Sequence, residues 1–233
     1  MKLSIIVPVY NEEKTIIKIL DLLFKVELDM KKEIIVIDDG STDMSKKVIR
    51  KYIRGKSISK KTRFKFLSKK NGGKGSAIIK GVELSSGEIV TIQDADLEYN
   101  PEDYKKLISP IVRGEYDVIY GSRFLKKHKP KYRIYFLGNK FLTFLTKLLY
   151  GSRITDMETC YKVFRSGVIK NLGLVSSGFD IEPETTAKVL KKGIKIKEIP
   201  ISYNPRSIEE GKKINWVDGI KAIYTLFYWR FKN

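Results

Sequence analysis

Cysteine and histidine are almost absent from this chain of 233 residues, which contains only Cys160 and His128. A single cysteine cannot form a disulfide within the chain and fits a reducing compartment. A single histidine cannot build a histidine-based zinc site, and a Ser-His-Asp triad would have to use a residue that lies among lysines. We therefore expect Cys160 to be a small buried hydrophobic residue and not a catalytic thiol.

Long hydrophobic runs are also missing. No stretch approaches the roughly 18 to 20 apolar residues that a membrane-spanning helix needs. The N-terminal stretch MKLSIIVPVYNEE is interrupted by Pro8 and ends in acidic residues, unlike a signal peptide. With no low-complexity tract and no internal repeat, these features predict a single cytoplasmic domain over residues 1–233.

The charge is strongly unbalanced, because 46 Lys and Arg residues face 27 Asp and Glu residues, for a formal net charge of +19. Such a surplus indicates an anionic partner: nucleic acid, an anionic membrane surface or phosphorylated substrates. A lysine-rich composition typical of a thermophile would explain much of the same charge without any partner.

Short β-branched runs alternate with segments of helical period through the first half of the chain. The expected strands cover residues 3–10, 33–39, 63–68, 88–96 and 117–123, with helices between them. This alternation predicts an α/β fold with a mainly parallel central sheet and helices on both faces. Ligands of such sheets bind beyond the carboxyl ends of the strands, so the residues after each strand are the candidates for function.

The pattern changes after residue 123, which divides the domain into halves at 1–123 and 124–233. Two amphipathic helices are expected near 134–150 and 215–232. On the first, a helical wheel separates Asn139, Lys140, Thr143, Thr146 and Lys147 from an apolar side of Leu137, Phe141, Phe144, Leu145, Leu148 and Leu149. Both helices could pack in a core, or lie on a membrane surface.

Five acids gather in the stretch TIQDADLEYNPED, residues 91–103. If the chain stays extended, Asp94, Asp96 and Glu98 point to one side and could hold Mg²⁺ or Mn²⁺ together with a diphosphate. The alternative is a solvated turn without chemistry. Glu102 and Asp103 are assigned to a helix start, because they follow Asn100-Pro101, a typical N-cap and first helical position.

A glycine-rich turn, Asn71-Gly72-Gly73-Lys74-Gly75, precedes the expected helix at 74–85. Glycines let backbone N–H groups approach a phosphate, and Lys74 adds a full positive charge. The turn is not a P-loop, because Gly75 stands where Ser or Thr should follow the lysine.

Four motifs, VPVYNEE, VIDDGSTD, NGGKGSA and QDADLE, occur in order, and together they resemble the family 2 glycosyltransferases with the nucleotide-sugar-binding GT-A fold. YGSRF at 120–124, TDMETCYKVFR at 155–165 and YNPRSIEEGKKINWVDGIKA at 203–222 resemble the dolichol or polyprenyl-phosphate sugar synthase branch. The resemblance covers nearly the whole chain.

The resemblance implies roles for individual residues. The nucleotide sugar would contact Pro8, Tyr10, Glu12, Asp39, Lys74, Asp94, Ala95 and Asp96, with Asp39 at the base. The metal would be held by Asp96, its principal ligand, and by Glu98. Phosphates of the donor or the acceptor would contact Arg123, Arg206 and either Lys212 or Lys213. The catalytic residues would be Asp96, Arg123 and Arg206.

The implied reaction is a metal-dependent, inverting transfer of a hexose from GDP-mannose or a UDP-sugar to a polyprenyl or dolichyl phosphate. The membrane surface, reached through the amphipathic helices or a partner membrane protein, would supply this acceptor, which is dianionic and needs no general base. If the acceptor is instead a glycan hydroxyl, Asp156, Asp180 or Glu182 is the candidate base.

Two further alternatives are an inactive transferase that acts as a binding subunit, and a basic nucleic-acid-binding module. The sequence disfavours the nucleic-acid module, because acidic residues rather than basic ones follow the strands and no DNA or RNA motif occurs.

Overall fold

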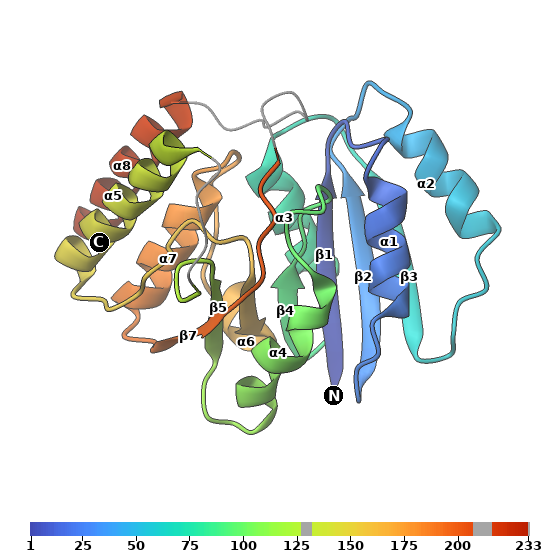
Figure 1. The fold of residues 1–233 in the computed structure, drawn as a ribbon, viewed down its shortest axis with the longest axis horizontal. Coiled ribbons are helices and arrows are strands. Elements are labelled where there is room, and N and C mark those ends of the chain that lie inside the picture. Colours follow the sequence, from blue (N-terminus) through green and yellow to red (C-terminus); the bar gives the residue numbers. More distant parts are fainter. Residues whose placement is uncertain (127–131, 207–215, 233) are drawn as a thin grey trace.

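The computed structural model describes residues 1–126, 132–206 and 216–232. Its centre is a seven-stranded sheet with the order β3-β2-β1-β4-β6-β5-β7 (Figure 1). Only β6 runs antiparallel to its neighbours, β4 and β5, so the expected mainly parallel sheet is confirmed. The strands are β1 (Lys2–Val9), β2 (Lys31–Asp38), β3 (Thr62–Ser68), β4 (Ile89–Ile92), β5 (Val118–Ser122), β6 (Lys162–Arg165) and β7 (Ile196–Pro200).

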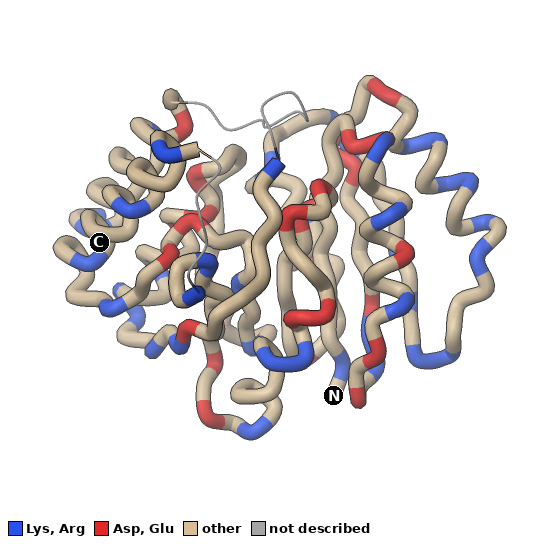
Figure 2. Tube along the Cα trace, in the orientation of Figure 1, with Lys and Arg blue, Asp and Glu red and all other residues tan. Residues whose placement is uncertain are grey.

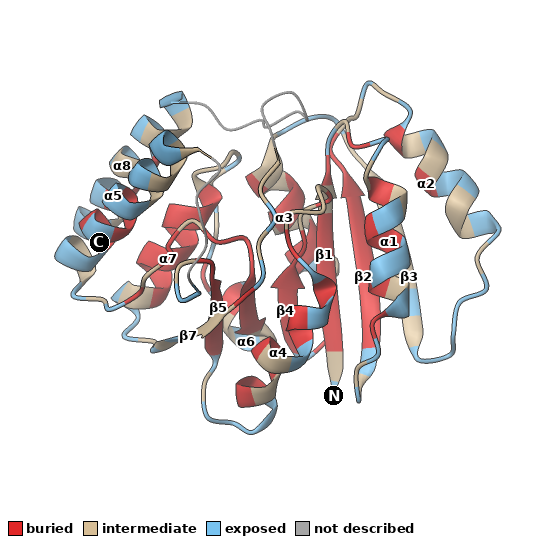
Figure 3. Ribbon diagram, in the orientation of Figure 1, coloured by how far each residue is buried: buried red, intermediate tan, exposed pale blue. Residues whose placement is uncertain are grey.

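Helices cover both faces of the sheet. Side chains of a strand alternate between the two faces, so a strand whose residues are all apolar needs a helix on each side. In β2, Ile34 and Val36 belong to a buried cluster that includes residues of α1 and α2, whereas Ile35 and Ile37 cluster with Ala77 of α3. The central strands are buried along most of their length (Figure 3). The described helices are α1 (Ile16–Lys25), α2 (Ser45–Arg54), α3 (Lys74–Leu84), the 3-10 turn η1 (Pro101–Asp103), α4 (Tyr104–Val112), α5 (Arg133–Tyr150), α6 (Ser166–Lys170), α7 (Ile181–Lys191) and α8 (Trp216–Phe231).

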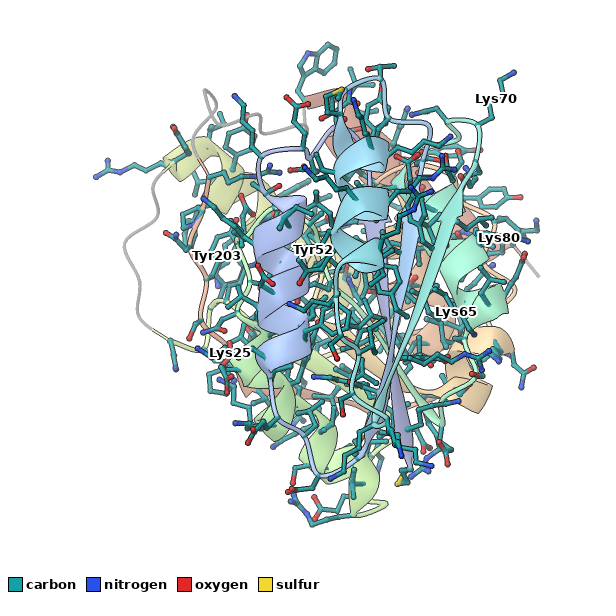
Figure 4. The ribbon with its side chains drawn as sticks, turned by 90° about the vertical axis from the view of Figure 1, so that its right-hand side faces the viewer. Lys25, Tyr52, Lys65, Lys70, Lys80 and Tyr203 are labelled. Atoms are coloured by element: carbon teal, nitrogen blue, oxygen red, sulfur yellow. The ribbon has the colours of Figure 1, made fainter. Side chains whose placement is uncertain are left out.

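Buried and interhelical polar groups fix the packing away from the strand ends. Figure 4 shows Tyr52 between α1 and α2, where its hydroxyl donates to Asp21 Oδ1 at 2.5 Å. In β2, the buried Glu33 carboxylate accepts from Ser4 Oγ at 2.6 Å and Ser86 Oγ at 2.8 Å, and pairs with Lys65 at 3.2 Å. Burial opposes ionisation of Glu33, but these partners bring its pKa down to about 2.

The expected helix start at Asn100 is confirmed. Asn100 Oδ1 accepts from Glu102 N at 3.1 Å and Pro101 occupies the first turn, which is a 3-10 turn leading into α4. Asp103 has a further contact, because its Oδ2 accepts from Ser202 N at 2.8 Å. This acid therefore also holds the segment after β7 against the start of α4.

The two amphipathic helices pack against each other through Leu142 and Leu145 of α5 and Ala222 and Leu226 of α8. No helix in the described parts of the chain has both the length and the hydropathy to cross a membrane.

The helical wheel for α5 left open whether its apolar side packs in a core or faces a membrane surface, and the structure leaves most of that side exposed. Leu137, Phe144 and Leu148 are 63%, 61% and 70% exposed, whereas Thr143 and Thr146 are buried. The reason is hydrogen bonding: Thr143 Oγ1 accepts from Met157 N at 3.1 Å, and Thr146 Oγ1 donates to Leu142 O at 2.8 Å. With their hydroxyls satisfied, the threonines enter the interior and the apolar stripe faces outward.

Candidate functional site

A cavity of about 1010 Å³ opens beyond the carboxyl ends of β1, β2 and β4. Several acidic residues lie at this edge of the sheet, whereas α2 carries many Lys and Arg residues (Figure 2). The predicted site residues that line the cavity are Pro8, Tyr10, Glu12, Asp39, Lys74, Asp94, Ala95, Asp96, Glu98, Arg123 and Arg206. Lys212 and Lys213 lie outside the described residues.

Three backbone N–H groups of the glycine-rich turn already have partners within the protein. Gly72 N and Gly73 N donate to the Asp39 carboxylate at 3.0 and 2.7 Å, and Gly75 N donates to Gly178 O at 3.2 Å. These three N–H groups therefore do not form the expected phosphate cradle, and Asp39 is the anion that Gly72 and Gly73 bind. Glycine is required at residue 75, because a Cβ there would lie 2.2 Å from Ser176 O.

Lys74 points into the cavity and contacts two acids. Its ammonium lies 2.9 Å from Asp94 Oδ1 and 3.5 Å from Glu182 Oε1. Burial opposes ionisation of both Lys74 and Asp94, yet their mutual attraction raises the pKa of Lys74 and lowers that of Asp94. Both groups therefore stay charged, and Lys74 can approach a diphosphate at the end of β4.

Asp96 and Glu98 converge on a cation, although the cation in the structure is a guanidinium. Arg206 Nη2 lies 3.0 Å from Asp96 Oδ2, its Nε lies 3.7 Å from Glu98 Oε1, and its Nη1 lies 3.3 Å from Glu12 Oε1. Burial, followed by the nearby Asp94 and Glu98 charges, raises the pKa of Asp96 to about 7 despite Arg206.

The route by which these acids converge differs from the expected extended strand. Leu97 has a φ of 66°, and Asp96 Oδ1 accepts from Glu98 N at 3.1 Å, so the segment turns sharply. Carboxylate oxygens suit Mg²⁺ or Mn²⁺. However, no group of three potential ligands in the described parts of the chain is arranged as a metal cage. A metal held by Asp96 and Glu98 would therefore need donor phosphate oxygens to complete its ligands.

Arg123, which follows β5 and lines the cavity, is already paired. Its Nε and Nη2 donate to the two oxygens of Asp156 at 2.7 Å each, and its backbone N donates to Asp156 Oδ2 at 2.9 Å. Asp156 is completely buried. This acid positions Arg123 and is a poor candidate for a general base.

The remaining base candidates are bonded as well. Asp180 Oδ1 accepts from Gly178 N at 3.1 Å, and Glu182 forms a buried ion pair with Lys162. Cys160 is buried, as expected, and burial raises the pKa of its thiol.

Glu158 lines the same cavity and was missed in the sequence. Its Oε1 is buried and has no hydrogen-bond partner among the described residues. Burial raises the pKa of Glu158 to about 7. No pattern in the sequence points to this residue, because it lies in an irregular segment between α5 and β6 where no periodicity marks its orientation.

The far end of the cavity is apolar. It extends between the N-terminal halves of α5 and α8, where its walls include Ile134, Leu142, Trp216, Ile220 and Ile223. The cavity is therefore polar at the strand ends and hydrophobic between the two amphipathic helices.

A twisted α/β sheet with an Asp-x-Asp motif after β4, facing a large cavity, is the architecture of a GT-A glycosyltransferase. Residues 4–173 match the sequence profile described as Glycosyl transferase family 2, and the chain belongs to this family.

Similar curated proteins include the dolichol-phosphate mannosyltransferase of Pyrococcus furiosus, which is 30% identical over 98% of this chain and 64% of its own length. An uncharacterized protein of Methanocaldococcus jannaschii, MJ1222, is 29% identical over 97% of this chain and 90% of its length. The dodecaprenyl-phosphate galacturonate synthase of Rhizobium johnstonii is 24% identical over 88% of this chain and 60% of its length. The chain thus spans less than two thirds of both named enzymes.

Among solved structures, glucosyl-3-phosphoglycerate synthase from Mycobacterium tuberculosis superimposes with a TM-score of 0.70, covering 98% of this chain and 79% of that chain at 20% identity. That structure contains Mn²⁺, uridine diphosphate and glucosyl-3-phosphoglycerate, and another structure of the same enzyme contains Mg²⁺ and uridine diphosphate. The likeness confirms the GT-A fold.

Proposed function

We propose that this glycosyltransferase moves a hexose from a nucleotide sugar to the phosphate of a polyprenyl or dolichyl lipid. The observation that carries the proposal is the shape of the cavity. It begins at Pro8, Tyr10 and Asp39, passes the acids after β4, and ends in the apolar space between α5 and α8. A nucleotide, a diphosphate and a lipid chain would find matching surroundings in that order.

The donor side supports a nucleoside diphosphate sugar. Lys74 and Arg206 supply positive charge near the expected position of the diphosphate, while Asp96 and Glu98 would hold Mg²⁺ or Mn²⁺. When bound, the metal would stabilise the negative charge that develops on the leaving diphosphate. GDP-mannose is the first donor to test, because the relative from Pyrococcus is named a dolichol-phosphate mannosyltransferase.

The acceptor side supports a phosphate rather than a hydroxyl. Asp156, the acid beside Arg123, has both oxygens committed to that arginine. A lipid monophosphate has a second pKa near ~6 and attacks the anomeric carbon without a base, with inversion. Arg123 and Arg206, with Lys212 or Lys213 as further candidates, would orient the attacking phosphate.

The outward faces of α5 and α8 support work at the cytoplasmic face of a membrane. Leu137, Phe144 and Leu148 of α5 lie with Tyr224 and Phe231 of α8 among the most exposed hydrophobic residues, at 61% to 74%. Aromatic and apolar side chains on paired helices suit the headgroup boundary. Each nearby basic residue would add about 1 kcal/mol of attraction to anionic lipid.

The test is a transfer assay with a panel of nucleotide sugars, Mg²⁺ or Mn²⁺, and a short polyprenyl phosphate. Formation of a lipid-linked sugar is expected, and product should disappear with EDTA. Transfer to a soluble glycan but not to the lipid phosphate would favour the hydroxyl-acceptor alternative.

Membrane binding is tested separately by flotation with anionic vesicles at physiological salt. The full chain should float, and a Leu137→Ser/Phe144→Ser/Leu148→Ser variant should float less. A variant with three exposed changes on α2, Lys47→Ser/Lys51→Ser/Arg54→Ser, controls for general surface change. Failure of the unmodified chain to float would point instead to a partner membrane protein.

A further inference from the structure

Glu158 differs from the other acids of the cavity in its bonding. Asp39 is bound by the glycine-rich turn, Asp94 by Lys74, Asp96 and Glu98 by Arg206, and Glu182 by Lys162. Glu158 Oε1 is buried beside them and has no hydrogen-bond partner among the described residues. A buried carboxyl oxygen without a partner destabilises the folded protein, which makes a ligand contact its natural use.

The cations nearest to Glu158 are already used. Arg123 forms two hydrogen bonds with Asp156, and Lys162 pairs with Glu182 and donates to Thr159 O at 2.6 Å. Three acids, Asp156, Glu182 and Glu158, thus lie near these two cations. Asp156 and Glu182 are paired with them, and Glu158 is not. Among the residues that the structure describes, Glu158 therefore has no ion-pair partner.

The sheet places Glu158 between the donor and acceptor sides. The order β2-β1-β4-β6-β5 puts Asp39 after β2, Asp96 after β4 and Arg123 after β5. Because β6 is antiparallel to β4, with Thr91 beside Val163, the residues ahead of β6 reach the edge where β4 ends. Glu158 precedes β6 and therefore lies between the expected diphosphate and the acceptor phosphate, where the transferred sugar must sit.

We infer that Glu158 binds hydroxyl groups of the transferred sugar and selects a neutral hexose over a sugar that carries a carboxylate. The inference rests on the proposed function. A sugar hydroxyl can donate to the free Oε1, whereas a uronate would bring a second carboxylate into the same buried space. Because burial raises the pKa of Glu158 to about 7, the carboxyl is mostly ionised above pH 7, and the discrimination against a uronate is expected in that pH range, so the affinities below are measured at pH 8.

A general base would leave a different signature. A base acts on the acceptor during the reaction, so its loss would lower turnover without changing the affinity for the donor. A sugar-binding carboxyl acts before the reaction, so its loss weakens binding of the nucleotide sugar even when no acceptor is present. The affinity of the nucleoside diphosphate, which lacks the sugar, should then stay the same.

The experiment measures Kd by calorimetry for the full chain with Mg²⁺ and no acceptor. The probes are GDP-mannose, UDP-glucose, UDP-galacturonate, GDP and UDP, and the variants are Glu158→Ala, Glu158→Gln and the exposed control Glu102→Gln. In Glu158→Ala, the Kd of the preferred neutral nucleotide sugar should rise about tenfold, while the Kd of GDP or UDP changes less than about twofold. In Glu158→Gln, the preference for the neutral sugar over UDP-galacturonate should fall.

Four results would overturn the inference. Equal weakening of the nucleotide sugar and the nucleoside diphosphate would mean that Glu158 only shapes the site. Unchanged donor affinity, combined with lost turnover in the transfer assay with polyprenyl phosphate, would make it a base. If the unmodified chain binds GDP or UDP but none of the nucleotide sugars, the proposed function itself fails. If it binds them and the variants bind equally well, only the role of Glu158 fails.

Discussion

Replacing Glu158 by glutamine should change how the stability of the protein depends on pH. In the unfolded chain this carboxyl ionises near its ordinary pKa of 4.5, whereas burial raises the folded pKa to about 7. Between these values the unfolded state loses its proton and the folded state keeps it, so the free energy of unfolding falls as the pH rises. At about 1.4 kcal/mol for each pH unit, the interval corresponds to about 3 kcal/mol.

The measurement is urea denaturation of wild type and Glu158→Gln at pH 4 and pH 8. Other titrating groups are present in both proteins, so their effects cancel when the two pH-dependent changes are subtracted. Relative to wild type, the variant should gain up to about 3 kcal/mol between pH 4 and pH 8. The exposed variant Glu102→Gln should gain nothing comparable.

Equal pH dependence of wild type and Glu158→Gln would refute the reasoning. It would mean that the carboxyl is hydrated or paired in solution, and that its buried, partnerless oxygen is not a property of the folded protein. A variant that is less stable than wild type at pH 8 would indicate a structural hydrogen bond instead.

Three other substitutions test the rest of the structure. Glu33→Gln should lower the free energy of unfolding by up to about 3 kcal/mol at pH 7, because the Glu33 pKa is depressed to about 2. When denaturation is measured at a series of pH values, this loss of stability should shrink as the pH falls from 4.5 toward 2. A loss that stays constant with pH would contradict the assignment. Gly75→Ala should lower the free energy of unfolding by about 2 kcal/mol, since the new Cβ would lie 2.2 Å from Ser176 O. Thermal melting should show this loss, and should show no loss for the control Gly167→Ala, whose Cβ would have nothing within 4 Å. Asp96→Ala should abolish sugar transfer, whereas Glu102→Ala should retain turnover and change the free energy of unfolding by less than about 0.5 kcal/mol. A fully active Asp96→Ala variant would show that Asp96 is not part of the catalytic site.

The sequence did not predict β6 and β7, but it was sufficient to predict the other five strands, the polar residues at their ends and the helix start at Asn100. These features depend on local signals: alternating hydrophobic periods, polar residues after β-branched runs, and an Asn-Pro cap. The cavity accordingly contains the predicted residues from the first half of the chain. Local chemistry and strand order together bring Asp39, Lys74, Asp94 and Asp96 to one edge.

Features that depend on distant partners could not be predicted in the same way. The periodicity of 134–150 identified an apolar stripe, but Met157 N decides that Thr143 faces inward. The acids after β4 pointed to a cation, but the guanidinium that they meet belongs to Arg206, more than a hundred residues away. Glu158 Oε1 has no partner among the described residues because Arg123 pairs with Asp156 and Lys162 pairs with Glu182.

The reversed direction of β6 has a consequence for engineering the enzyme. A chimera that exchanges residues 124–233 for those of a relative would keep the strands β1 to β5 but import β6, which inserts between β4 and β5. Glu158 and Lys162 would be exchanged with this second half of the chain, although β6 pairs with β4. A swap at that boundary that aims at the acceptor would therefore also replace Glu158, the residue proposed to bind the sugar. A clean exchange of acceptors has to leave residues 155–165 in place.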